Sequence, residues 1–421
     1  MARDPGSLAS EAGNGIEGEA LKECGIRRDA TPERPGATAR IIAGAFHGVE
    51  FGKLFGTASR YHRGRSFTGA CFEERAWMRI LMANPRGFCA GVHMAIDVVD
   101  QLLDLCPGEP IYVYHEIVHN KHVVDRFRRR GVTFVEDVSE VPEDSLVVFS
   151  AHGVSPAVRQ EAAAKRLQSV DATCPLVTKV HMEAIRYAKQ GYQILLVGHA
   201  NHQEVQGTRG EAPDAIQVVE SPDDIPSLRI KDPNRLAYLT QTTLSTDDAG
   251  VIISALKKAF PNIKEPPGGD ICYATTNRQT AVRRIAAECD LVLVIGSKNS
   301  SNSLRLTEIS RNAGVKAYLI DDVSELDWSL FTGDETVLVT AGASAPEDLV
   351  AELCKRLLDR FGGNIEVRDV FEEDTEFDIP ATLKRLMRER GVDPSTRRIR
   401  VTKPDITAEA YGAVPLTVGA T

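Results

Sequence analysis

Apolar and polar positions alternate in a regular way between residue 78 and residue 368. Short runs of apolar and β-branched residues are each followed by an amphipathic stretch with helical spacing. This alternation predicts α/β units built around parallel sheets. The run Met78-Arg79-Ile80-Leu81 predicts the first strand, so we expect the α/β region to begin there.

One local pattern recurs five times in this region. An apolar run leads into a short polar loop with His, Ser, Thr or Cys, and then into a helix start. The five segments are LVVFS-AHGVSP, ILLVGHA-NHQEV, LAYLT-QTTLSTDD, LVLVIGS-KNSSNS and TVLVT-AGASAPEDL. In an open parallel sheet such loops gather at one edge, where helix N-termini present unpaired N–H groups and a positive dipole end. The pattern favours a phosphate or diphosphate site.

Helix capping is the simpler explanation for any one serine in these loops. Ser155 precedes a proline and Ser344 stands three residues before Glu347, and both arrangements are typical of helix N-termini. Capping does not explain why histidines are interleaved with hydroxyl residues in similar loops. At this point a serine in these loops is interpreted either as a cap or as a ligand contact.

The two ends of the chain have a different composition. Residues 1–77 are rich in Gly, Ala, Arg and Glu with little periodicity, which predicts a leader that is disordered or not native, with Met78 as a plausible start. Residues 369–421 contain FEEDTEFDIP and RRIRVTKPD, which predicts a charged tail that is partly extended or mobile.

The overall charge and hydropathy exclude two classes of partner. The 421-residue chain has 50 Lys+Arg against 59 Asp+Glu, a net charge of −9, which argues against general nucleic-acid binding. It has no apolar run of about eighteen residues and no signal-peptide pattern at its acidic N-terminus. We therefore expect no membrane partner and a cytoplasmic location.

Three of the eight cysteines share a local context. Cys89, Cys174 and Cys272 each follow a short apolar or acidic stretch and open a helical one, and similar lengths of chain separate them. This spacing would fit three comparable lobes that each contribute one thiol to a common centre. For the other five, packing or incidental exposure is the better interpretation: Cys24, Cys71, Cys106, Cys289 and Cys354.

Several kinds of chemistry would use three converging thiols. Zinc sites usually contain close C-x-x-C pairs, which this chain lacks. A cysteine nucleophile with a histidine base needs only one thiol. An iron–sulfur cluster bound by three cysteines uses all three and leaves one iron with an exchangeable position. Spacing alone leaves these alternatives open, together with three unrelated buried thiols.

A set of longer motifs resembles one known family. The motifs, in order between Met78 and Phe361, are ANPRGFCAGV, HEIVHNKHVVD, FSAHGVSPAV, DATCPLVTKVH, GHANHQEVQGT, TQTTLS, DICYATTNRQ, GSKNSSNS and TAGASAPE. Together they resemble the 4-hydroxy-3-methylbut-2-enyl diphosphate reductases. The resemblance implies three similar α/β lobes with small, mostly parallel sheets around a central cluster-binding cavity, over about 78–170, 171–265 and 266–368.

The resemblance also implies the residues of the site. The family's single 4Fe-4S cluster, with one iron open to substrate, corresponds to Cys89, Cys174 and Cys272, and Gly87 and Gly91 would allow close backbone approach. The family's diphosphate pocket corresponds to His119, His152, His202, Ser300, Ser301, Asn302 and Ser344. We expect four further histidines to be packed or solvent-facing: His115, His122, His181 and His199.

The implied activity is the last step of the non-mevalonate isoprenoid pathway. The family removes the hydroxyl of a small allylic diphosphate reductively and forms isopentenyl and dimethylallyl diphosphate, with electrons from an external donor such as flavodoxin or ferredoxin. Glu204 resembles the family's proton-delivering acid and Thr242 its hydrogen-bonding partner.

Two other function classes remain to be distinguished from this one. A cluster-free acyl or phosphate transferase would depend on one cysteine and one histidine. A non-catalytic redox or phosphometabolite sensor usually has an attached output domain, and residues 369–421 look too short and charged to form one.

Overall fold

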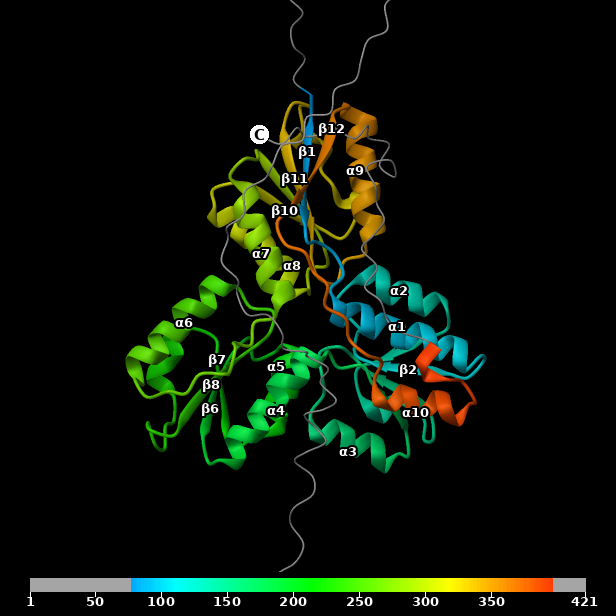
Figure 1. Cartoon of the computed structure of the whole chain (residues 1–421), viewed down its shortest axis with the longest axis vertical. Coiled ribbons are helices and arrows are strands. Elements are labelled where there is room, and N and C mark those ends of the chain that lie inside the picture. Colours follow the sequence, from blue (N-terminus) through cyan, green and yellow to red (C-terminus); the bar gives the residue numbers. More distant parts are fainter. Residues whose placement is uncertain (1–76, 397–421) are drawn as a thin grey trace, which may run out of the picture. The chain divides into compact units, whose positions relative to one another are not determined.

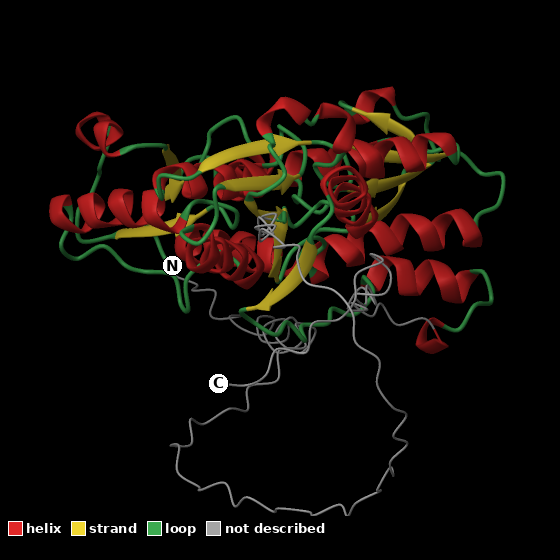
Figure 2. Cartoon of the chain, turned by 90° about the horizontal axis from the view of Figure 1, so that it is seen from above, coloured by secondary structure: helices red, strands yellow, loops and turns green. Residues whose placement is uncertain are grey.

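The computed structural model describes residues 77–396, so the predictions for residues 1–76 and 397–421 lie outside the described residues. The described part contains three separate parallel sheets, each flanked by helices (Figure 1; Figure 2). We name the parts around the four-, three- and five-stranded sheets lobe 1, lobe 2 and lobe 3. The predicted α/β class is confirmed. Within residues 77–396, none of the helices has the length and hydropathy needed to cross a membrane.

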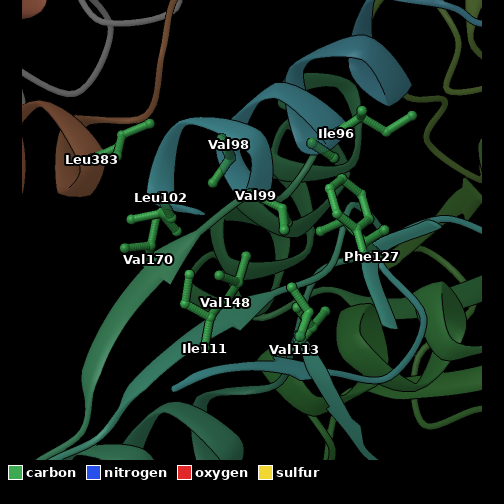
Figure 3. Packing of buried hydrophobic residues seen from close by; sticks show 14 of the residues in the cluster. Ile96, Val98, Val99, Leu102, Ile111, Val113, Phe127, Val148, Val170 and Leu383 are labelled. Atoms are coloured by element: carbon green, nitrogen blue, oxygen red, sulfur yellow. The ribbon is translucent and has the colours of Figure 1, made fainter. Parts of the chain in front are cut away.

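Lobe 1 has the strand order β3-β2-β4-β5. Its strands are β2 (Ile111–Tyr114), β3 (Thr133–Val135), β4 (Leu146–Phe149) and β5 (Gln168–Asp171), and its helices are α1 (Ala90–Leu105), α2 (Lys121–Arg129), α3 (Pro156–Ala164) and α10 (Ala381–Glu389). Val148 packs among residues of α1 and α2 (Figure 3). Val147 packs on the opposite face with Ala162 of α3. Complete burial of a side chain such as Phe127 contributes roughly 1.5–3 kcal/mol.

Lobe 2 has the strand order β7-β6-β8. Its strands are β6 (Gln193–Val197), β7 (Ile216–Val219) and β8 (Leu236–Thr240), and its helices are α4 (Pro175–Lys189), α5 (Gln203–Glu211) and α6 (Thr246–Ala259). Leu195 of β6 packs in one core cluster with Ile252 of α6, and Leu196 packs in another with Val180 of α4. Both faces of the strand are thus buried, which explains its uninterrupted apolar sequence.

Lobe 3 has the strand order β10-β9-β11-β1-β12. Its strands are β1 (Arg79–Asn84), β9 (Leu291–Ile295), β10 (Lys316–Ile320), β11 (Thr336–Ala341) and β12 (Asn364–Asp369), and its helices are α7 (Tyr273–Ala286), α8 (Ser301–Asn312) and α9 (Glu347–Phe361). Helix α9 contributes to the core on one face, and α7 and α8 contribute to the core on the other. Short 3-10 helices span Val138–Glu140, Pro222–Ser227, Val323–Glu325, Trp328–Leu330 and Pro394–Thr396.

Strand β1 lies in lobe 3, although chain order predicts it in the first lobe. It pairs in parallel with β11 and with β12, so that Leu81 is opposite both Leu338 and Glu366. The physical reason is long-range: β1 is apolar on both faces and fills the sheet between two strands from the end of the region. In the structure, lobe 1 therefore begins after β1.

The predicted charged tail begins at the last residue of β12. Beyond it, residues 370–380 connect lobe 3 to α10, which packs on lobe 1 (Figure 1). Leu383 and Met387 of α10 are buried in the lobe 1 core, next to Leu102 of α1. The first part of the tail is therefore an ordered connection between two lobes, because its few apolar residues share one helix face.

All five predicted strand-loop-helix segments are present. Strands β4, β6, β8, β9 and β11 are followed by α3, α5, α6, α8 and α9 respectively. The loops between them carry five of the proposed site residues, and the first turns of α5 and α8 carry three more.

Candidate functional site

A cavity of about 100 Å³ brings together residues from all three lobes. Every side chain that the sequence analysis proposes for the site lines it: Cys89, His119, His152, Cys174, His202, Glu204, Thr242, Cys272, Ser300, Ser301, Asn302 and Ser344. These residues come from loops that are far apart in the chain. The fold therefore gathers the whole predicted set around one space.

Five of the lining residues are N-caps of helices. They are Cys89 of α1, Cys174 of α4, His202 of α5, Cys272 of α7 and Ser300 of α8. The first turn of a helix has N–H groups without intrahelical partners and a partial positive charge. Because no lysine or arginine is among the lining residues of the described chain, helix termini supply much of the cavity's attraction for an anion.

Cys89, Cys174 and Cys272, which we name the thiol cluster, come from three different helix starts. None of them is in a disulfide, and the side chains of Cys89 and Cys174 form no capping hydrogen bond. The Sγ atom of Cys272 accepts the N–H of Thr275 at 3.4 Å and lies 3.2 Å from the Thr275 hydroxyl.

Burial and the neighbouring Cys89 favour the protonated forms of Cys174 and Cys272. Burial, followed by the neighbouring Cys89, raises the pKa of Cys174 well above its ordinary value, against the opposing effect of two backbone N–H groups. The same two causes raise the pKa of Cys272 to about 11, although Thr275 lowers it slightly. Three thiolates would not coexist here without a positively charged partner.

Two glycines beside the thiol cluster are required for different reasons. A Cβ atom on Gly91 would lie 2.5 Å from Sγ of Cys174, so only glycine leaves room for that thiol. Gly87 has a φ of +65°, which favours glycine, and its carbonyl accepts hydrogen bonds from the buried Arg278 at 3.1 and 2.8 Å. The expectation of close backbone approach is confirmed for Gly91 at Cys174, whereas Gly87 is needed for its backbone conformation.

Arg278 of α7 ties together the segments beside two of the thiols. Besides Gly87, its guanidinium donates to the carbonyl of Ala274 at 3.0 Å and to the carboxylate of Glu373 at 3.1 Å. Glu373 belongs to the connection between β12 and α10. The loop before Cys89, the helix after Cys272 and this connection therefore share one buried cation.

The second group, which we name the polar cluster, comprises His119, His152, His202, Ser300, Ser301, Asn302 and Ser344. The rings of His119 and His152 are stacked with centroids 4.0 Å apart. His202 is edge-on to both, with centroids 5.5 Å from His119 and 6.0 Å from His152. The three imidazoles thus form one contiguous group on the cavity wall.

Two of these histidines are neutral at physiological pH. Burial lowers the pKa of His152 well below its ordinary value, and the neighbouring His119 and His202 lower it further. Burial and His119 also lower the pKa of His202, to about 3. Nδ1 of His202 accepts the N–H of Glu204 at 3.2 Å, so the proton of the neutral ring is on Nε2.

Some serines of these loops cap helices, and others form hydrogen bonds between loops. Ser155, outside the cavity, caps α3 as predicted, and Ser300 caps α8 by accepting the N–H of Ser303 at 3.4 Å. The cap interpretation of Ser344 is wrong, because α9 begins at Glu347 with Pro346 as its N-cap.

The remaining members of the polar cluster connect its loops. The hydroxyl of Ser344 donates to the carbonyl of His119 at 2.8 Å, and the hydroxyl of Ser301 donates to the carbonyl of Thr243 at 3.3 Å. Oδ1 of Asn302 accepts the N–H of Ala343 at 2.8 Å. The contacts of Ser344 and Ser301 join lobe 3 to the other two lobes, and the contact of Asn302 connects two loops within lobe 3.

Glu204 and Thr242 form a buried hydrogen-bonded pair. The N–H of Thr242 lies 2.6 Å from one carboxyl oxygen of Glu204, and its hydroxyl lies 3.1 Å from the other. Burial raises the pKa of Glu204 to about 7, although the two contacts with Thr242 oppose that shift. A carboxyl group with this pKa is half protonated near neutral pH and can deliver a proton.

Sequence reasoning missed several residues of the site. Thr243 and Thr275 line the cavity, and Glu116 accepts hydrogen bonds beside it from His119 and Asn299. The signal for Glu116 was its position three residues before His119. The four histidines expected outside the site do not line the cavity, and each contacts a carboxylate: His115, His122, His181 and His199.

The described residues contain no group of three or more His, Cys, Asp and Glu side chains that could hold a single metal ion. The ligands of one ion must converge on a point, whereas the ligands of a cluster bind separate irons and stand further apart. Three cysteine thiols that line one cavity are the type of donor that an iron–sulfur cluster uses.

Comparison with protein families and sequences gives one consistent result. A family model described as LytB protein matches residues 80–358. A 4-hydroxy-3-methylbut-2-enyl diphosphate reductase from Acidothermus cellulolyticus is 52% identical over 320 residues, which cover 76% of this chain and 94% of that protein. A protein of the same name from Rhodopirellula baltica is 51% identical over 314 residues, which cover 75% and 98%.

Solved structures give the same result. The structure of E-1-hydroxy-2-methyl-but-2-enyl-4-diphosphate reductase from Plasmodium falciparum is similar with a TM-score of 0.72 and 40% identity, and the match covers 75% of this chain and 99% of that chain. A structure of (E)-4-hydroxy-3-methyl-but-2-enyl diphosphate reductase, described as the terminal enzyme of the non-mevalonate pathway, matches with a TM-score of 0.51 at 32% identity and covers 67% and 99%.

Proposed function

The chain belongs to the LytB family, and we propose that the cavity between its lobes is where it reduces 4-hydroxy-3-methylbut-2-enyl diphosphate. It is an oxidoreductase of isoprenoid biosynthesis that forms isopentenyl and dimethylallyl diphosphate. The observation that carries the assignment to this cavity is the meeting of three thiols, an anion site and a protonatable carboxyl group around one space.

The reaction defines what the residues must supply. The allylic C–O bond breaks, the hydroxyl group leaves as water, and a new C–H bond forms. Two electrons and two protons are consumed for each substrate. Hydroxide is a poor leaving group, so a proton has to reach the oxygen as the bond breaks.

The thiol cluster fits a 4Fe-4S cluster with Cys89, Cys174 and Cys272 as its ligands. Its three thiols line one cavity, and bound iron would replace the protons that the raised pKa values of Cys174 and Cys272 retain. When bound, such a cluster supplies electrons and one iron with an open position that acts as a Lewis acid. We assign the supply of electrons to an external one-electron donor protein such as flavodoxin or ferredoxin.

The polar cluster would hold the diphosphate. His202 presents Nε2–H as a donor, and the N-terminus of α8 presents Ser301 and Asn302 with backbone N–H groups. These donors bind an anion without a large basic patch, in agreement with the acidic chain. By holding the diphosphate, they would orient the hydroxyl end of the substrate.

Glu204 would deliver the proton through or beside Thr242. Its backbone N–H contacts His202 of the polar cluster, and its carboxyl group lies near enough to Cys272 to affect the thiol's pKa. Glu204 is thus between the two groups, where a substrate bound by both would place its hydroxyl. The hydroxyl of Thr242 can accept the proton of Glu204 and pass on its own.

The experiment that tests this function starts with anaerobic purification of the full chain, iron and sulfide analysis, and Mössbauer and electron paramagnetic resonance spectroscopy. We expect four irons per chain, one of them altered by the hydroxylated diphosphate, and formation of both products with a one-electron reductant. A folded protein that binds diphosphate but stays free of iron after reconstitution would instead support a transferase or sensor.

A further inference from the structure

The three histidines of the polar cluster differ in the partner of their Nδ1 atoms. Nδ1 of His202 accepts the backbone N–H of Glu204, and Nδ1 of His152 is 3.2 Å from the hydroxyl of Ser150. Nδ1 of His119 is 3.1 Å from a carboxyl oxygen of Glu116. His119 is therefore the member of this cluster whose ring nitrogen faces a carboxylate.

Glu116 is an ionised acceptor. Burial raises its pKa, but hydrogen bonds from His119 and Asn299 outweigh burial, and the net shift is downward. An ionised carboxylate only accepts hydrogen bonds, so Nδ1 of His119 must carry a proton and donate. If Nε2 of the same ring is to donate to a phosphate oxygen, the ring must carry two protons and a positive charge.

The other two histidines do not need a charge to bind an anion. His202 donates from Nε2 as a neutral ring, and burial keeps both His152 and His202 neutral. Three imidazolium rings this close together would also repel one another. The arrangement favours one charged ring, and the only one of the three that faces a carboxylate is His119.

We propose that His119 is the charged histidine of the diphosphate site and that Glu116 is the positioning residue that keeps it doubly protonated when the diphosphate binds. This inference rests on the proposed function, because it assumes that the polar cluster binds a diphosphate. Glu116 itself lines no part of the cavity and acts through His119.

Contacts from lobe 3 fix this pair in place. The same oxygen of Glu116 accepts a hydrogen bond from Nδ2 of Asn299 at 2.8 Å, in the loop before α8. The hydroxyl of Ser344 donates to the carbonyl of His119, and the N–H of Lys121 donates to the hydroxyl of Ser297 at 3.1 Å. The orientation of the His119 ring is therefore tied to the lobe that supplies Ser300 and Ser301.

The charged and titratable groups around this pair can be named. His152, from the loop after β4, stacks on His119, and His202, at the start of α5, is edge-on to it. Arg128 of α2 acts electrostatically on Glu116. His152 and His202 stay neutral, but Glu204, which lines the same cavity, has a pKa of about 7. The part of the pH effect on diphosphate affinity that reports His119 is therefore the part that is lost when Glu116 is replaced.

The chain offers a matched control in the same lobe. Nδ1 of His115 is 2.7 Å from Glu136, but His115 does not line the cavity and Glu136 is largely exposed. Glu136→Gln removes a carboxylate from a histidine in the same way as Glu116→Gln. It should leave diphosphate affinity unchanged.

The test is calorimetric titration of inorganic diphosphate into the iron-loaded full chain between pH 6 and pH 9. At each pH, the ratio of the dissociation constants of Glu116→Gln and wild type cancels the ionisation of diphosphate itself. We expect a ratio of roughly ten near neutral pH that falls towards one at high pH, where wild-type His119 also loses its second proton. In turnover, KM should rise and kcat should stay nearly constant, and Glu116→Asp should restore part of the affinity.

A ratio near one at every pH, or a ratio that does not vary with pH, would overturn the inference. If Glu116→Gln does not fold, His119→Asn provides the test, because its amide can donate a hydrogen bond but cannot become charged. The ratio of its dissociation constant for diphosphate to that of wild type must then show the same pH dependence. If wild type binds diphosphate with this behaviour but does not reduce the allylic substrate, the proposed function fails and the charge assignment stands.

Discussion

The thiol cluster and the polar cluster are built in the same way, but they differ in whether their side chains already have binding partners within the protein. Both use residues at helix N-termini from separate lobes. In the polar cluster the side chains already have protein partners, such as Ser303 for Ser300 and Glu204 for His202. In the thiol cluster burial raises the pKa of Cys174 and Cys272, so these groups are protonated until a metal replaces the protons.

The difference teaches how the two clusters depend on the rest of the protein. The anion site is preorganised by hydrogen bonds and helix dipoles, and it should bind diphosphate with or without iron. The thiol cluster becomes functional only when it binds a metal. Variants that affect one cluster and spare the other therefore test the comparison.

The largest effect is expected from Cys89→Ser. A serine hydroxyl is a poor ligand for iron, so iron and sulfide content should fall sharply and turnover should drop below detection, while diphosphate affinity stays within a few-fold of wild type. Iron analysis checks the metal content, and calorimetry checks the diphosphate affinity. The matched control is Cys289→Ser, at a half-buried thiol outside the cavity, which should keep full iron content. Equal iron in both variants would remove Cys89 from the ligand set.

Glu204→Gln should slow the chemical step and leave iron binding and diphosphate binding unchanged. The amide keeps the size and the contact with Thr242 but cannot release a proton to the substrate. We expect kcat to fall by about 10²–10⁴-fold with normal iron content and normal diphosphate affinity. Single-turnover and steady-state rates of the anaerobic enzyme measure this loss. Full activity in this variant would exclude Glu204 as the proton donor.

Gly91→Ala tests the close approach of the backbone to the thiol cluster. The new Cβ atom would lie 2.5 Å from Sγ of Cys174, so it should displace this thiol and weaken iron binding by roughly 10–100-fold. The control is Gly250→Ala in α6, where a Cβ meets nothing within 4 Å and should stabilise the fold by about 0.5–1 kcal/mol. The rate of iron loss to a chelator distinguishes the two variants, and equal rates would contradict the steric argument.

Local sequence patterns predicted the parts of this molecule that depend on local chemistry. The five strand-loop-helix segments are present, and the twelve proposed side chains line one cavity. Each of these predictions relied on a motif whose residues fold into one loop. The resemblance of the motifs to a family supplied the connection between loops, which periodicity cannot provide.

Features that depend on long-range pairing were not predictable in the same way. Nothing in the sequence of β1 indicates that it pairs with β11 and β12 at the other end of the region. The packing of α10 on lobe 1 was hidden by its charged surroundings, because only one face of the helix is apolar. Glu116 was overlooked because its role appears only when Asn299 and His119 are seen to share its carboxylate.

The pH profile gives the smallest effect and separates the two clusters within one data set. The pKa of Glu204 is raised to about 7 by burial, so the acid form is present below that pH and is lost above it. We expect kcat to be level below pH 7 and to fall by up to about tenfold per pH unit above it. In Glu204→Gln this fall should disappear.

KM should follow a different group in the same experiment. Since kcat reports the enzyme–substrate complex, it reflects the proton donor, whereas KM also reflects how diphosphate binds to His119. Glu116→Gln should therefore change the pH dependence of KM and leave that of kcat in place. If both variants altered the same parameter, the proton-delivery pair and the anion site would be one coupled unit, and the separation of roles between Glu204 and the polar cluster would be wrong.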